Sequence, residues 1–424
     1  MKYLVILGDG MADRPVQSLG GKTPLQAADI PEMDWLAGHG CNGLLATVPD
    51  GYAPGSEIAH LAIFGYDLDR VFEGRGALEA ASMGVPIEEG EMAMRCNLVT
   101  VEDGRILNHS AGQISTEEAS VLMSFLQDNL GGDGFSFHTG VSYRHLLKMK
   151  GGNKHIVCTP PHDIAGQPYA GYMIRPEPET SVFPQTAPAV LPSAELAGRA
   201  ETARKLNELI LKSMEILSSH PVNIARARAG KCMASSIWPW SPGYRPMMEP
   251  LSERYPQLRK GSVISAVDLI KGIGVYAGLV PVKVEGATGL YDTNYEGKAE
   301  AALKALEDED FVFLHVEASD EAGHDGDPRL KVRTIEYLND RIVRPVLDRI
   351  LKWDCPVSVA LLPDHPTPCS IRTHTADPVP FTIFRTSGCG ADGVREFDEF
   401  SAAKGCYGTL PASRFMDLFI EQQL

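Results

Sequence analysis

Residues 311–324 read FVFLHVEASDEAGH, an apolar run that is followed by acidic and imidazole side chains. A continuous apolar run such as FVFLHV is typical of a strand that is buried on both faces of a parallel sheet. Residues 3–7 and 357–362 have the same character, and an aspartate follows each of them within two residues. We therefore predict three buried parallel strands whose carboxyl ends carry polar side chains.

Helical and strand patterns alternate at both ends of the chain. We predict helices at residues 23–38, 56–64, 265–279 and 328–353, and further strands at residues 280–284 and 379–384. This alternation predicts an α/β fold with a doubly wound sheet. Between about residues 72 and 255 such strands are scarce and Gly and Pro are frequent. We therefore predict a core domain of residues 1–71 and 256–424 and an inserted domain of residues 72–255.

Composition restricts the partners of the protein. The 424-residue chain is 44% hydrophobic and carries a formal net charge of −16, which disfavours nucleic acids and anionic membranes. A small anionic substrate would need local positive charge. The eight cysteines are scattered and form no C-x-x-C pair, which argues against a disulfide framework or a zinc ribbon. The apolar N-terminal run is too short to span a membrane, so we expect a reduced, cytoplasmic enzyme.

Candidate metal ligands follow the predicted strands. In open α/β sheets, ligands bind at the carboxyl ends of the strands. Carboxylates and neutral imidazoles bind Mn²⁺, Zn²⁺ and similar ions, and two such ions can clamp a phosphoryl group during transfer. Taken singly, each residue could instead cap a helix or form a turn. The candidates are Asp9, Asp320, His324, Asp364, His365 and His374.

Ser56 is the candidate nucleophile. It follows Pro54 and Gly55 and begins a predicted helix, where backbone N–H groups stabilise an anion. A nearby metal ion would favour its alkoxide form. The alternative is that Ser56 only caps the helix.

Several short strings together resemble the cofactor-independent phosphoglycerate mutases of the archaeal type, in the alkaline phosphatase superfamily. The resemblance runs over essentially the whole chain. It implies an alkaline-phosphatase-like core with an inserted smaller α/β (α+β) domain that closes over the site. The strings are Gly8-Asp9-Gly10, Pro54-Gly55-Ser56, Gly74-Arg75-Gly76, Lys260-Gly261, the segment from Asp320 to Gly326, and Asp364-His365-Pro366-Thr367-Pro368.

The resemblance also implies roles for individual residues. Ser56 would carry the phosphate in the glycolytic interconversion of 2-phosphoglycerate and 3-phosphoglycerate. Two divalent ions, Mn²⁺ or Zn²⁺ with Mg²⁺ as a further candidate, would assist it. The first ion would be bound by Asp9, Ser56, Asp364 and His365, and the second by Asp320, His324 and His374. The substrate contacts would be Arg144, Lys260, Arg75 and His162.

Three departures from the family leave the substrate open. NHSAGQ (residues 108–113) replaces an arginine-rich string, TPPHD (residues 159–163) differs from the usual run, and Glu57 follows Ser56 in place of Asp. These changes resemble a bacterial subset that has been proposed to act as homoserine kinases of threonine biosynthesis, although the chain lacks an ATP-binding P-loop motif. A small-molecule phosphatase and an inactive binding protein are further alternatives. Trp238 and Trp240 could stack on a ring, or could simply belong to the core.

Overall fold

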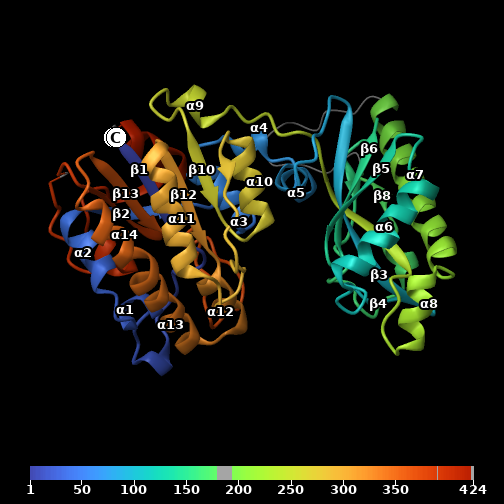
Figure 1. The fold of residues 1–424 in the computed structure, drawn as a ribbon, viewed down its shortest axis with the longest axis horizontal. Coiled ribbons are helices and arrows are strands. Elements are labelled where there is room, and N and C mark those ends of the chain that lie inside the picture. The colour runs from blue at the N-terminus through green and yellow to red at the C-terminus, as the bar shows by residue number, and fades with distance from the viewer. Residues whose placement is uncertain (179–192, 389, 422–424) are drawn as a thin grey trace. The chain divides into compact units, whose positions relative to one another are not determined.

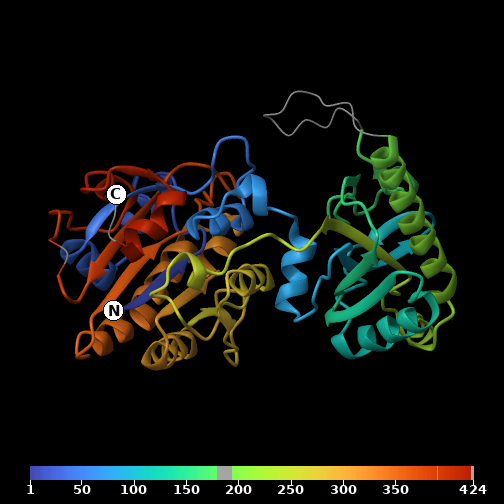
Figure 2. The ribbon, with the colours of Figure 1, turned by 90° about the horizontal axis from the view of Figure 1, so that it is seen from above.

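The computed structural model describes residues 1–178, 193–388 and 390–421. It divides into two compact units, unit 1 (Met1–Phe72 and Met247–Leu424) and unit 2 (Glu73–Pro246) (Figure 1). Both ends of the chain lie in unit 1, as Figure 2 shows. Residue 72 and residues 247–255, which we predicted to lie in the inserted domain, fall in unit 1. The reason is packing, because Tyr255 is buried and its hydroxyl donates a hydrogen bond of 2.7 Å to Asp417.

Unit 1 is built on an eight-stranded sheet in the order β11-β10-β12-β1-β13-β14-β2-β15. The first five strands of this order run parallel, and β14 is antiparallel to both of its neighbours. The strands are β1 (Lys2–Gly8), β2 (Cys41–Ala46), β10 (Gly261–Ile264), β11 (Val280–Pro281), β12 (Phe311–Val316), β13 (Val357–Leu362), β14 (Val379–Arg385) and β15 (Thr409–Pro411).

Helices cover both faces of this sheet. Successive residues of a strand point to opposite faces. On one face, Ile6 and Leu314 belong to a core cluster that also contains residues of helices α2, α11, α13 and α14. On the other face, the ring of Phe313 lies 4.8 Å from that of Phe64, which directly follows helix α3. The predicted α/β fold with a doubly wound sheet is therefore confirmed.

Two predicted long helices are interrupted. The helix predicted for residues 23–38 is split into α1 and α2, because Pro31 lacks an N–H group and disfavours helical geometry at Ile30. The helix predicted for residues 328–353 contains a π-helical turn, η3, and ends at Ile350. The bounds are α1 (Pro24–Ala27), α2 (Pro31–His39), α13 (Pro328–Leu338), η3 (Asn339–Val343) and α14 (Arg344–Ile350).

The other predicted elements differ mainly in length. The strand predicted at residues 280–284 is only the two-residue β11, and the helix predicted at residues 265–279 shortens to α10. The remaining helical elements of unit 1 are η1 (Gln17–Leu19), α3 (Ser56–Ile63), α4 (Leu68–Val71), α9 (Leu251–Arg254), α10 (Asp268–Tyr276), α11 (Tyr295–Asp308), α12 (Ala318–Asp325), α15 (Glu399–Ala402), η4 (Ala412–Arg414) and η5 (Asp417–Glu421).

Unit 2 has an antiparallel sheet with its own core. Its strands follow the order β4-β3-β6-β5, and β9 also pairs with β3. Helices α6 and α7 contribute apolar residues to one core cluster with this sheet. The strands are β3 (Glu91–Glu102), β4 (Arg105–Asn108), β5 (Phe135–Val141), β6 (Arg144–Lys150), β9 (Ser236–Gly243) and the separate pair β7 (Ile156–Val157) and β8 (Arg175–Pro176). The helices are α5 (Arg75–Ser82), α6 (Thr116–Leu130), η2 (Tyr169–Tyr172), α7 (Ser193–Leu217) and α8 (Pro221–Arg228).

Two chain-wide features accompany this fold. Within the described ranges, no helix is both long enough and apolar enough to cross a lipid bilayer. No disulfide joins any two of the seven described cysteines.

Candidate metal centre

Three neighbouring parallel strands end at the candidate site. Because β1 lies between β12 and β13, the carboxyl ends of the three strands meet at one edge of the sheet. Asp9 follows β1, Glu317 and Asp320 follow β12, and Asp364 follows β13. All except Glu317 are buried, and Glu317 is only partly exposed. The topology thus brings carboxylates from distant parts of the chain together.

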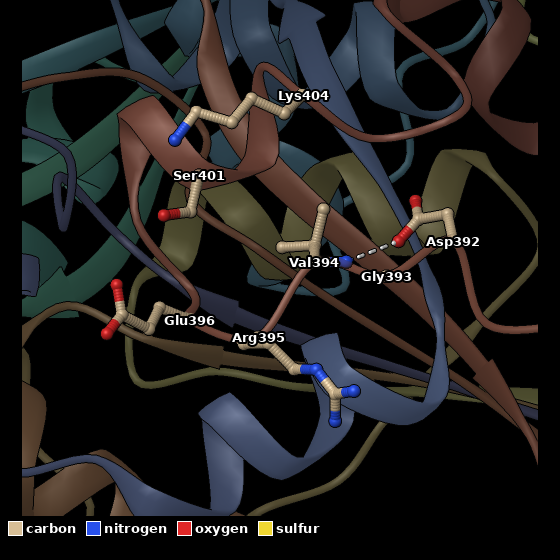
Figure 3. Close-up of a pocket in the computed structure, with 7 residues that line it drawn as sticks. All are labelled: Asp392, Gly393, Val394, Arg395, Glu396, Ser401 and Lys404. Atoms are coloured by element: carbon tan, nitrogen blue, oxygen red, sulfur yellow. Dashed lines mark hydrogen bonds between the residues drawn. The ribbon is translucent and has the colours of Figure 1, made fainter.

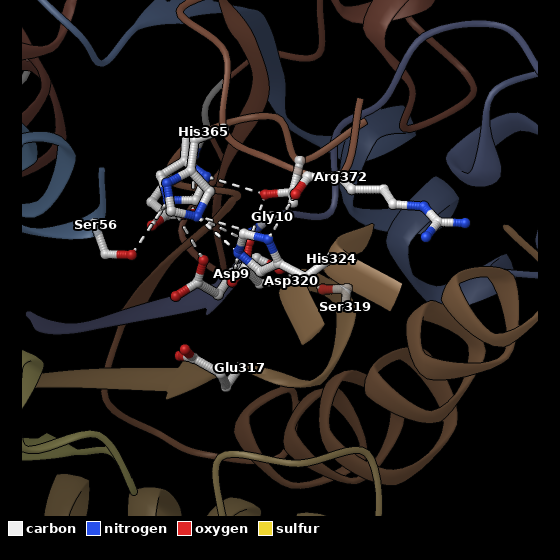
Figure 4. A network of polar contacts seen from close by, with 12 residues as sticks. Asp9, Gly10, Ser56, Glu317, Ser319, Asp320, His324, His365 and Arg372 are labelled. Atoms are coloured by element: carbon white, nitrogen blue, oxygen red, sulfur yellow. Dashed lines mark hydrogen bonds and ion pairs between the residues drawn. The ribbon is translucent and has the colours of Figure 1, made fainter. Parts of the chain in front are cut away.

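Ser56 faces the first group of predicted ligands. Its Oγ lies 3.2 Å from Nε2 of His365. The same nitrogen lies 3.1 Å from Oδ2 of Asp364 and 3.7 Å from Oδ1 of Asp9. Ser56 is the first residue of α3, and the residue at the cap position is Gly55. The capping alternative for Ser56 is therefore not supported, since its hydroxyl is directed to the site instead (Figure 4).

The second group of predicted ligands surrounds Asp320. Nε2 of His324 lies 3.2 Å from its Oδ2, and Nε2 of His374 lies 3.5 Å from its Oδ1. The two imidazole nitrogens are 3.0 Å apart. The ring of His365, from the first group, lies 4.0 Å from that of His374. The two groups are therefore adjacent.

The donor atoms form compact sets that suit metal ions. In each of two sets, Asp320 with His365 and His374, and Asp9 with Asp364 and His365, the donor atoms lie within 4.8 Å of one another. Oδ1 of Asp9 and Oδ2 of Asp364 are buried and have no hydrogen-bond partner among the described residues. Buried carboxylate oxygens without donors are costly unless a cation compensates them. The residues present therefore fit divalent ions.

Electrostatics at Asp9 support the same conclusion. Burial, and then the charges of Asp364, Glu317 and Asp320, raise the pKa of Asp9 well above its usual range. Four carboxylates held this close repel one another in a medium of low polarity. A bound divalent ion would offset this repulsion and keep Asp9 ionised.

In the second group, hydrogen bonding orients His324. Burial opposes ionisation of Asp320, but hydrogen bonds with His324 and His374 outweigh it and hold its pKa well below the usual range. The hydrogen bond to Asp320 raises the pKa of His324 to about 9. Nδ1 of His324 lies 3.1 Å from the carbonyl oxygen of Arg372, a residue with a φ of 61°. This contact directs Nε2 of His324 toward the site.

Gly10 allows the two groups to approach each other. Its φ is +61°, and a Cβ atom built on it would lie 2.6 Å from Oδ1 of Asp320 and 2.7 Å from Oγ1 of Thr367. Its N–H donates a hydrogen bond of 3.0 Å to Oδ1 of Asp364. Only glycine combines this backbone conformation with so close a contact.

Lys331 forms hydrogen bonds with two segments of the site. Its ammonium group is fully buried and donates to the carbonyl oxygens of Ala12 and Thr367, at 3.0 and 2.8 Å, and to Oδ2 of Asp13 at 2.9 Å. One segment follows β1 and the other follows β13. Lys331, on α13, therefore holds together the two loops that carry Asp9 and Asp364.

Sequence reasoning missed three residues at this site: His60, His315 and Glu317. Nδ1 of His60 lies 2.7 Å from the carbonyl oxygen of Ser56, and Nε2 of His315 lies 2.8 Å from Oδ2 of Asp9. Burial lowers the pKa of both histidines, so they are uncharged near neutral pH. Both had a signal in the sequence: His60 is four residues after Ser56 on one helix, and His315 interrupts the apolar run FVFLHV.

Comparison with known proteins shows the family. A family model described as 2,3-bisphosphoglycerate-independent phosphoglycerate mutase matches residues 37–223. The protein of that name from Methanosarcina barkeri is 47% identical, over 99% of this chain and 100% of its own. The chain belongs to the 2,3-bisphosphoglycerate-independent phosphoglycerate mutase family. The family predicted from the sequence is therefore confirmed.

Solved structures agree with membership of this mutase family. A structure from Pyrococcus horikoshii matches with a TM-score of 0.79 and 30% identity, covering 99% of this chain and 96% of that one. The cofactor-independent phosphoglycerate mutase from Thermoplasma acidophilum matches with a TM-score of 0.67 and 28% identity, covering 100% of both chains. The likeness covers the whole chain and is not confined to one unit.

Lys260, predicted as a substrate contact by likeness to the mutases, is not at this site. It immediately precedes β10, and its backbone lies beside Asp310, which precedes β12. Because β10 and β12 run parallel, Lys260 lies at their amino ends. The carboxyl ends are about 20 Å away at 3.3 Å per residue over the six residues of β12. The prediction for Lys260 is therefore wrong, because a strand separates it from the metal groups.

The other three predicted substrate contacts of the mutase lie in unit 2, around Arg95. The guanidinium of Arg95 lies 4.3 Å from the ring centre of Trp240. Burial lowers the pKa of Arg95, the charge of Glu79 opposes this effect, and the charges of Arg75 and Arg144 add to it. The ring of His162 lies 5.6 Å from that of Trp240. Sequence reasoning named Arg75, Arg144 and His162 but missed Arg95, whose signal was a charge inside the apolar strand β3.

The loop that lacks the family's arginines lies next to this cluster. Oδ1 of Asn108 accepts hydrogen bonds of 2.9 Å from the N–H groups of Ser110 and Gly112, so the side chain closes its own turn. The ring of His109 lies 6.3 Å from that of His162. The basic side chains of this region therefore come from β3, α5 and β6.

Both tryptophans of the WPW string belong to the interior of unit 2. Nε1 of Trp238 donates to the carbonyl oxygen of Thr159 at 2.9 Å, and Nε1 of Trp240 donates to Oδ1 of Asn97 at 3.1 Å. Both side chains are buried. This supports the alternative that the two tryptophans belong to the core. The guanidinium of Arg95 lies over the ring of Trp240.

A separate surface cavity of about 270 Å³ is formed by residues 392–396 with Ser401 and Lys404 (Figure 3). Asp392 accepts a hydrogen bond from the N–H of Asn42, at the start of β2. Since β2 is antiparallel to β14, and β14 is antiparallel to β13, the start of β2 lies at the edge opposite the metal groups. The cavity is therefore not part of the candidate metal centre.

Proposed function

We propose that this chain interconverts 2-phosphoglycerate and 3-phosphoglycerate by transferring the phosphoryl group through Ser56. Full-length relatives named as phosphoglycerate mutases support the reaction. The observation that carries the role of Ser56 is its Oγ, 3.2 Å from His365 and next to the carboxylates of Asp9 and Asp364.

The proposal includes two divalent ions of the Mn²⁺ or Zn²⁺ class. Asp9, Asp364 and His365 would hold one ion beside Ser56, and Asp320, His324 and His374 would hold the other. When bound, such ions lower the pKa of a coordinated hydroxyl and offset charge on phosphoryl oxygens. The unpartnered oxygens of Asp9 and Asp364 support this assignment.

Ser56 provides the temporary attachment point for the phosphate. Its Oγ gives up its proton and forms the bond to phosphorus while the bond from phosphorus to one glycerate hydroxyl oxygen breaks, and that oxygen takes up a proton. The glycerate then turns, and its other hydroxyl oxygen loses a proton and attacks phosphorus, while the bond from phosphorus to Oγ breaks and Oγ of Ser56 takes up a proton. Ser56 starts an eight-residue helix, whose N–H groups favour negative charge at this position.

The arginine cluster of unit 2 would bind the carboxylate of the glycerate. Arginine side chains bind planar anions through two parallel hydrogen bonds. Arg75, Arg95 and Arg144 are close enough to one another for their charges to interact. This cluster would make up for the arginines that are absent from residues 108–113.

Replacing Ser56 tests the mechanism. In the presence of Mn²⁺, the wild-type protein should convert 3-phosphoglycerate to 2-phosphoglycerate, as followed by ³¹P NMR. Ser56→Ala should lose at least about 10³-fold in rate, since it removes the covalent step. Ser218→Ala is the matched control, because that serine is exposed on unit 2, where its hydroxyl donates to the carbonyl oxygen of Glu215.

A trapped intermediate gives a second readout. Rapid acid quenching during turnover should yield a phosphopeptide that contains Ser56, and no such peptide should come from Ser56→Ala. A Ser56→Ala variant that keeps the rate of the Ser218→Ala control would contradict the proposal.

One observation favours a second candidate, a kinase that phosphorylates a hydroxyl amino acid. Residues 108–113 carry no arginine, and Asn108 satisfies this turn internally. A doubly anionic substrate would therefore lose contacts there, whereas homoserine would not need them. If the mutase proposal holds, incubation with ATP and homoserine should give no phosphohomoserine. Rapid phosphorylation of homoserine, together with no conversion of 3-phosphoglycerate, would favour the kinase.

A further inference from the structure

Another cavity, of about 620 Å³, lies in unit 1 at the carboxyl ends of β2 and β15. The two strands are parallel, and their last residues, Ala46 and Pro411, both line it. The other lining residues come from the segments 48–52, 62–69 and 412–413. In open α/β sheets, ligands bind at the carboxyl ends of strands, and cavities of about 300–1,000 Å³ hold small organic molecules. The cavity therefore has the position and the size of a ligand site.

This cavity is separate from the candidate metal centre. None of its lining residues is a candidate metal ligand. In the sheet, β14 lies between β2 and β13, so the ends of β2 and β13 are about 10 Å apart at about 4.8 Å per strand. Ala62, which lines the cavity, is six residues after Ser56 on α3, about 9 Å along the helix at about 1.5 Å per residue. The cavity is therefore a neighbour of the centre and not a part of it.

Apolar side chains form most of the wall of the cavity. Val48, Ala62 and Leu68 line it and are buried, and the buried ring of Tyr66 adds an aromatic surface. The guanidinium of Arg254 lies 5.0 Å from the centre of that ring, but it donates to two main-chain carbonyl oxygens, at 2.9 and 3.0 Å, and does not line the cavity. A short hydrocarbon chain fits a wall of this kind.

Three carboxylates, from Asp50, Asp67 and Asp69, complete the lining, which contains no Lys, Arg or His. The hydroxyl of Tyr52 donates a hydrogen bond to Oδ1 of Asp69, and the N–H of Asp69 donates one of 3.2 Å to Oδ1 of Asp67. These bonds bring the segment that carries Asp50 to the start of α4. Burial raises the pKa of Tyr52 to about 12, and the hydrogen bond and charge of Asp69 and the charge of Asp67 contribute. The potential at this end of the cavity is therefore negative.

The lining selects the charge of the ligand. The carboxylates would repel a phosphorylated anion, so the proposed substrate does not suit this cavity. A divalent metal ion is also a poor fit. Within the described ranges, the sets of donor atoms that lie close enough together to hold a metal ion do not include Asp50, Asp67 or Asp69. Carboxylates beside an apolar wall suit an organic cation, whose ammonium groups accept single contacts and whose chain needs an apolar surface.

We propose that this cavity binds a linear aliphatic diamine or polyamine. One ammonium group is bound by Asp67 and Asp69, the methylene chain packs on the apolar wall, and a second ammonium group is bound by Asp50. The proposal does not rest on the proposed function, because the site contains neither Ser56 nor a metal ligand. Tyr52 precedes Ser56 by four residues and α3 follows it, so the ligand contacts the chain on both sides of that serine.

Calorimetric titration of the full-length chain with 1,4-diaminobutane tests the site. The wild type should bind one diamine per chain. At the same concentration, 1,4-butanediol, a neutral molecule of the same length, should not bind. The double variant Asp67→Asn/Asp69→Asn should lose at least about tenfold in affinity, because it removes two charges and keeps an oxygen acceptor for both hydrogen bonds.

A matched double variant separates the cavity from the general charge of the chain. The formal net charge of −16 attracts any polyamine weakly. Glu300→Gln/Glu307→Gln removes two charges from α11, where the side chains are 68% and 59% exposed, and should bind the diamine like the wild type. Equal affinities of the two double variants would overturn the proposal.

A crystallographic measurement locates the ligand without any variant. Wild-type crystals soaked in 1,4-diaminobutane should show density for an extended chain between Asp50 and the pair Asp67 and Asp69. A cavity that stays empty at a saturating concentration overturns the proposal. Binding of a lysine-rich peptide by a chain that does not bind the diamine also overturns it, since the cavity would then belong to a protein partner. Neither measurement depends on turnover, so failure of the mutase assay would leave this proposal unaffected.

Discussion

At the level of single residues, the second metal group depends on the competition between a proton and a cation for His324. The hydrogen bond to Asp320 raises the pKa of His324 to about 9, so without metal this imidazole is protonated at neutral pH. A metal ion binds only the neutral ring. Protonated His324 therefore acts as a substitute for the cation next to Asp320.

This competition predicts how metal affinity depends on pH. Below about pH 9, each fall of one unit makes deprotonation of His324 harder, so Mn²⁺ affinity at this group should fall by up to about tenfold per unit. Above about pH 9 the dependence should flatten. Calorimetric titrations from pH 6.5 to 9.5 measure it. His324→Gln is the comparison, since it should bind more weakly but with a shallower slope; equal slopes for the two proteins would contradict the argument.

Position 10 requires glycine because there is no room for a side chain, and not because a functional group is needed there. Gly10→Ala would force a Cβ atom to within 2.6 Å of Asp320 and would also strain a backbone with φ near +61°. We expect a loss of several kcal/mol in unfolding free energy and weaker metal binding. Gly20→Ala separates the two effects, because Gly20 has a similar φ of +71° but nothing within 4 Å of its Cβ position.

The outcome of that pair is measured by urea unfolding and Mn²⁺ titration. Gly20→Ala should lose only about 1 kcal/mol, the cost of left-handed geometry for a residue with a side chain, and should keep its metal. Equal losses for the two variants would mean that crowding at Asp320 is unimportant.

At the level of secondary-structure elements, sequence reasoning succeeded where one local signal decides the outcome. FVFLHV and VSVALL were predicted with the bounds of β12 and β13, because an unbroken apolar run between polar residues permits little else. Their aspartates then mark the edge of the sheet where the ligands gather. The direction of β14 was not predictable, because a strand's direction is set by the connection between strands rather than by its own residues.

Two errors of the sequence prediction, at His315 and at Lys260, concern contacts between distant segments. His315 lies inside a buried strand, where an isolated polar residue in a sequence cannot be told from a satisfied core histidine. The prediction for Lys260 was wrong for a different reason. The resemblance to the mutases implied a role for this residue but did not indicate at which edge of the sheet it lies. Contacts between distant segments decide both cases.

Helix α13 has a role beyond covering the sheet, because its Lys331 joins two ligand-bearing loops. Lys331→Met keeps the aliphatic stem but removes the ammonium, leaving Asp13 charged and without this partner in a buried place. Breaking a buried ion pair in this way costs about 3–5 kcal/mol. We therefore expect lower thermal stability together with weaker Mn²⁺ binding.

Differential scanning calorimetry and metal titration check both effects. Lys304→Met on α11 is the control, since Lys304 is exposed and should change neither quantity. If Lys331→Met were destabilised but bound Mn²⁺ like the wild type, the lysine would serve the fold and not the geometry of the loops.

At the level of the whole molecule, the two units differ in how the chain builds them. Unit 1 needs both ends of the chain, because β1 lies between β12 and β13. Unit 2 is one continuous segment, Glu73–Pro246, with an apolar core of its own that includes Leu98, Leu147 and Trp238. A core closed within one segment does not require the remainder of the chain in order to form.

Unit 2 should therefore fold by itself when produced as residues 73–246. The antiparallel sheet of five strands and the helices α6 and α7 keep their partners in this fragment, so we expect a cooperative thermal transition and well-dispersed amide NMR signals. Residues 1–72 produced alone should remain unfolded, because β1 would lack both of its neighbouring strands.

The isolated unit 2 should also bind no Mn²⁺ at micromolar concentration, since every carboxylate and imidazole of the candidate metal centre lies in unit 1. An unfolded fragment would show that the core of unit 2 depends on contacts with the other segments, and tight Mn²⁺ binding by a folded one would mean that a metal site lies outside the strand ends of unit 1.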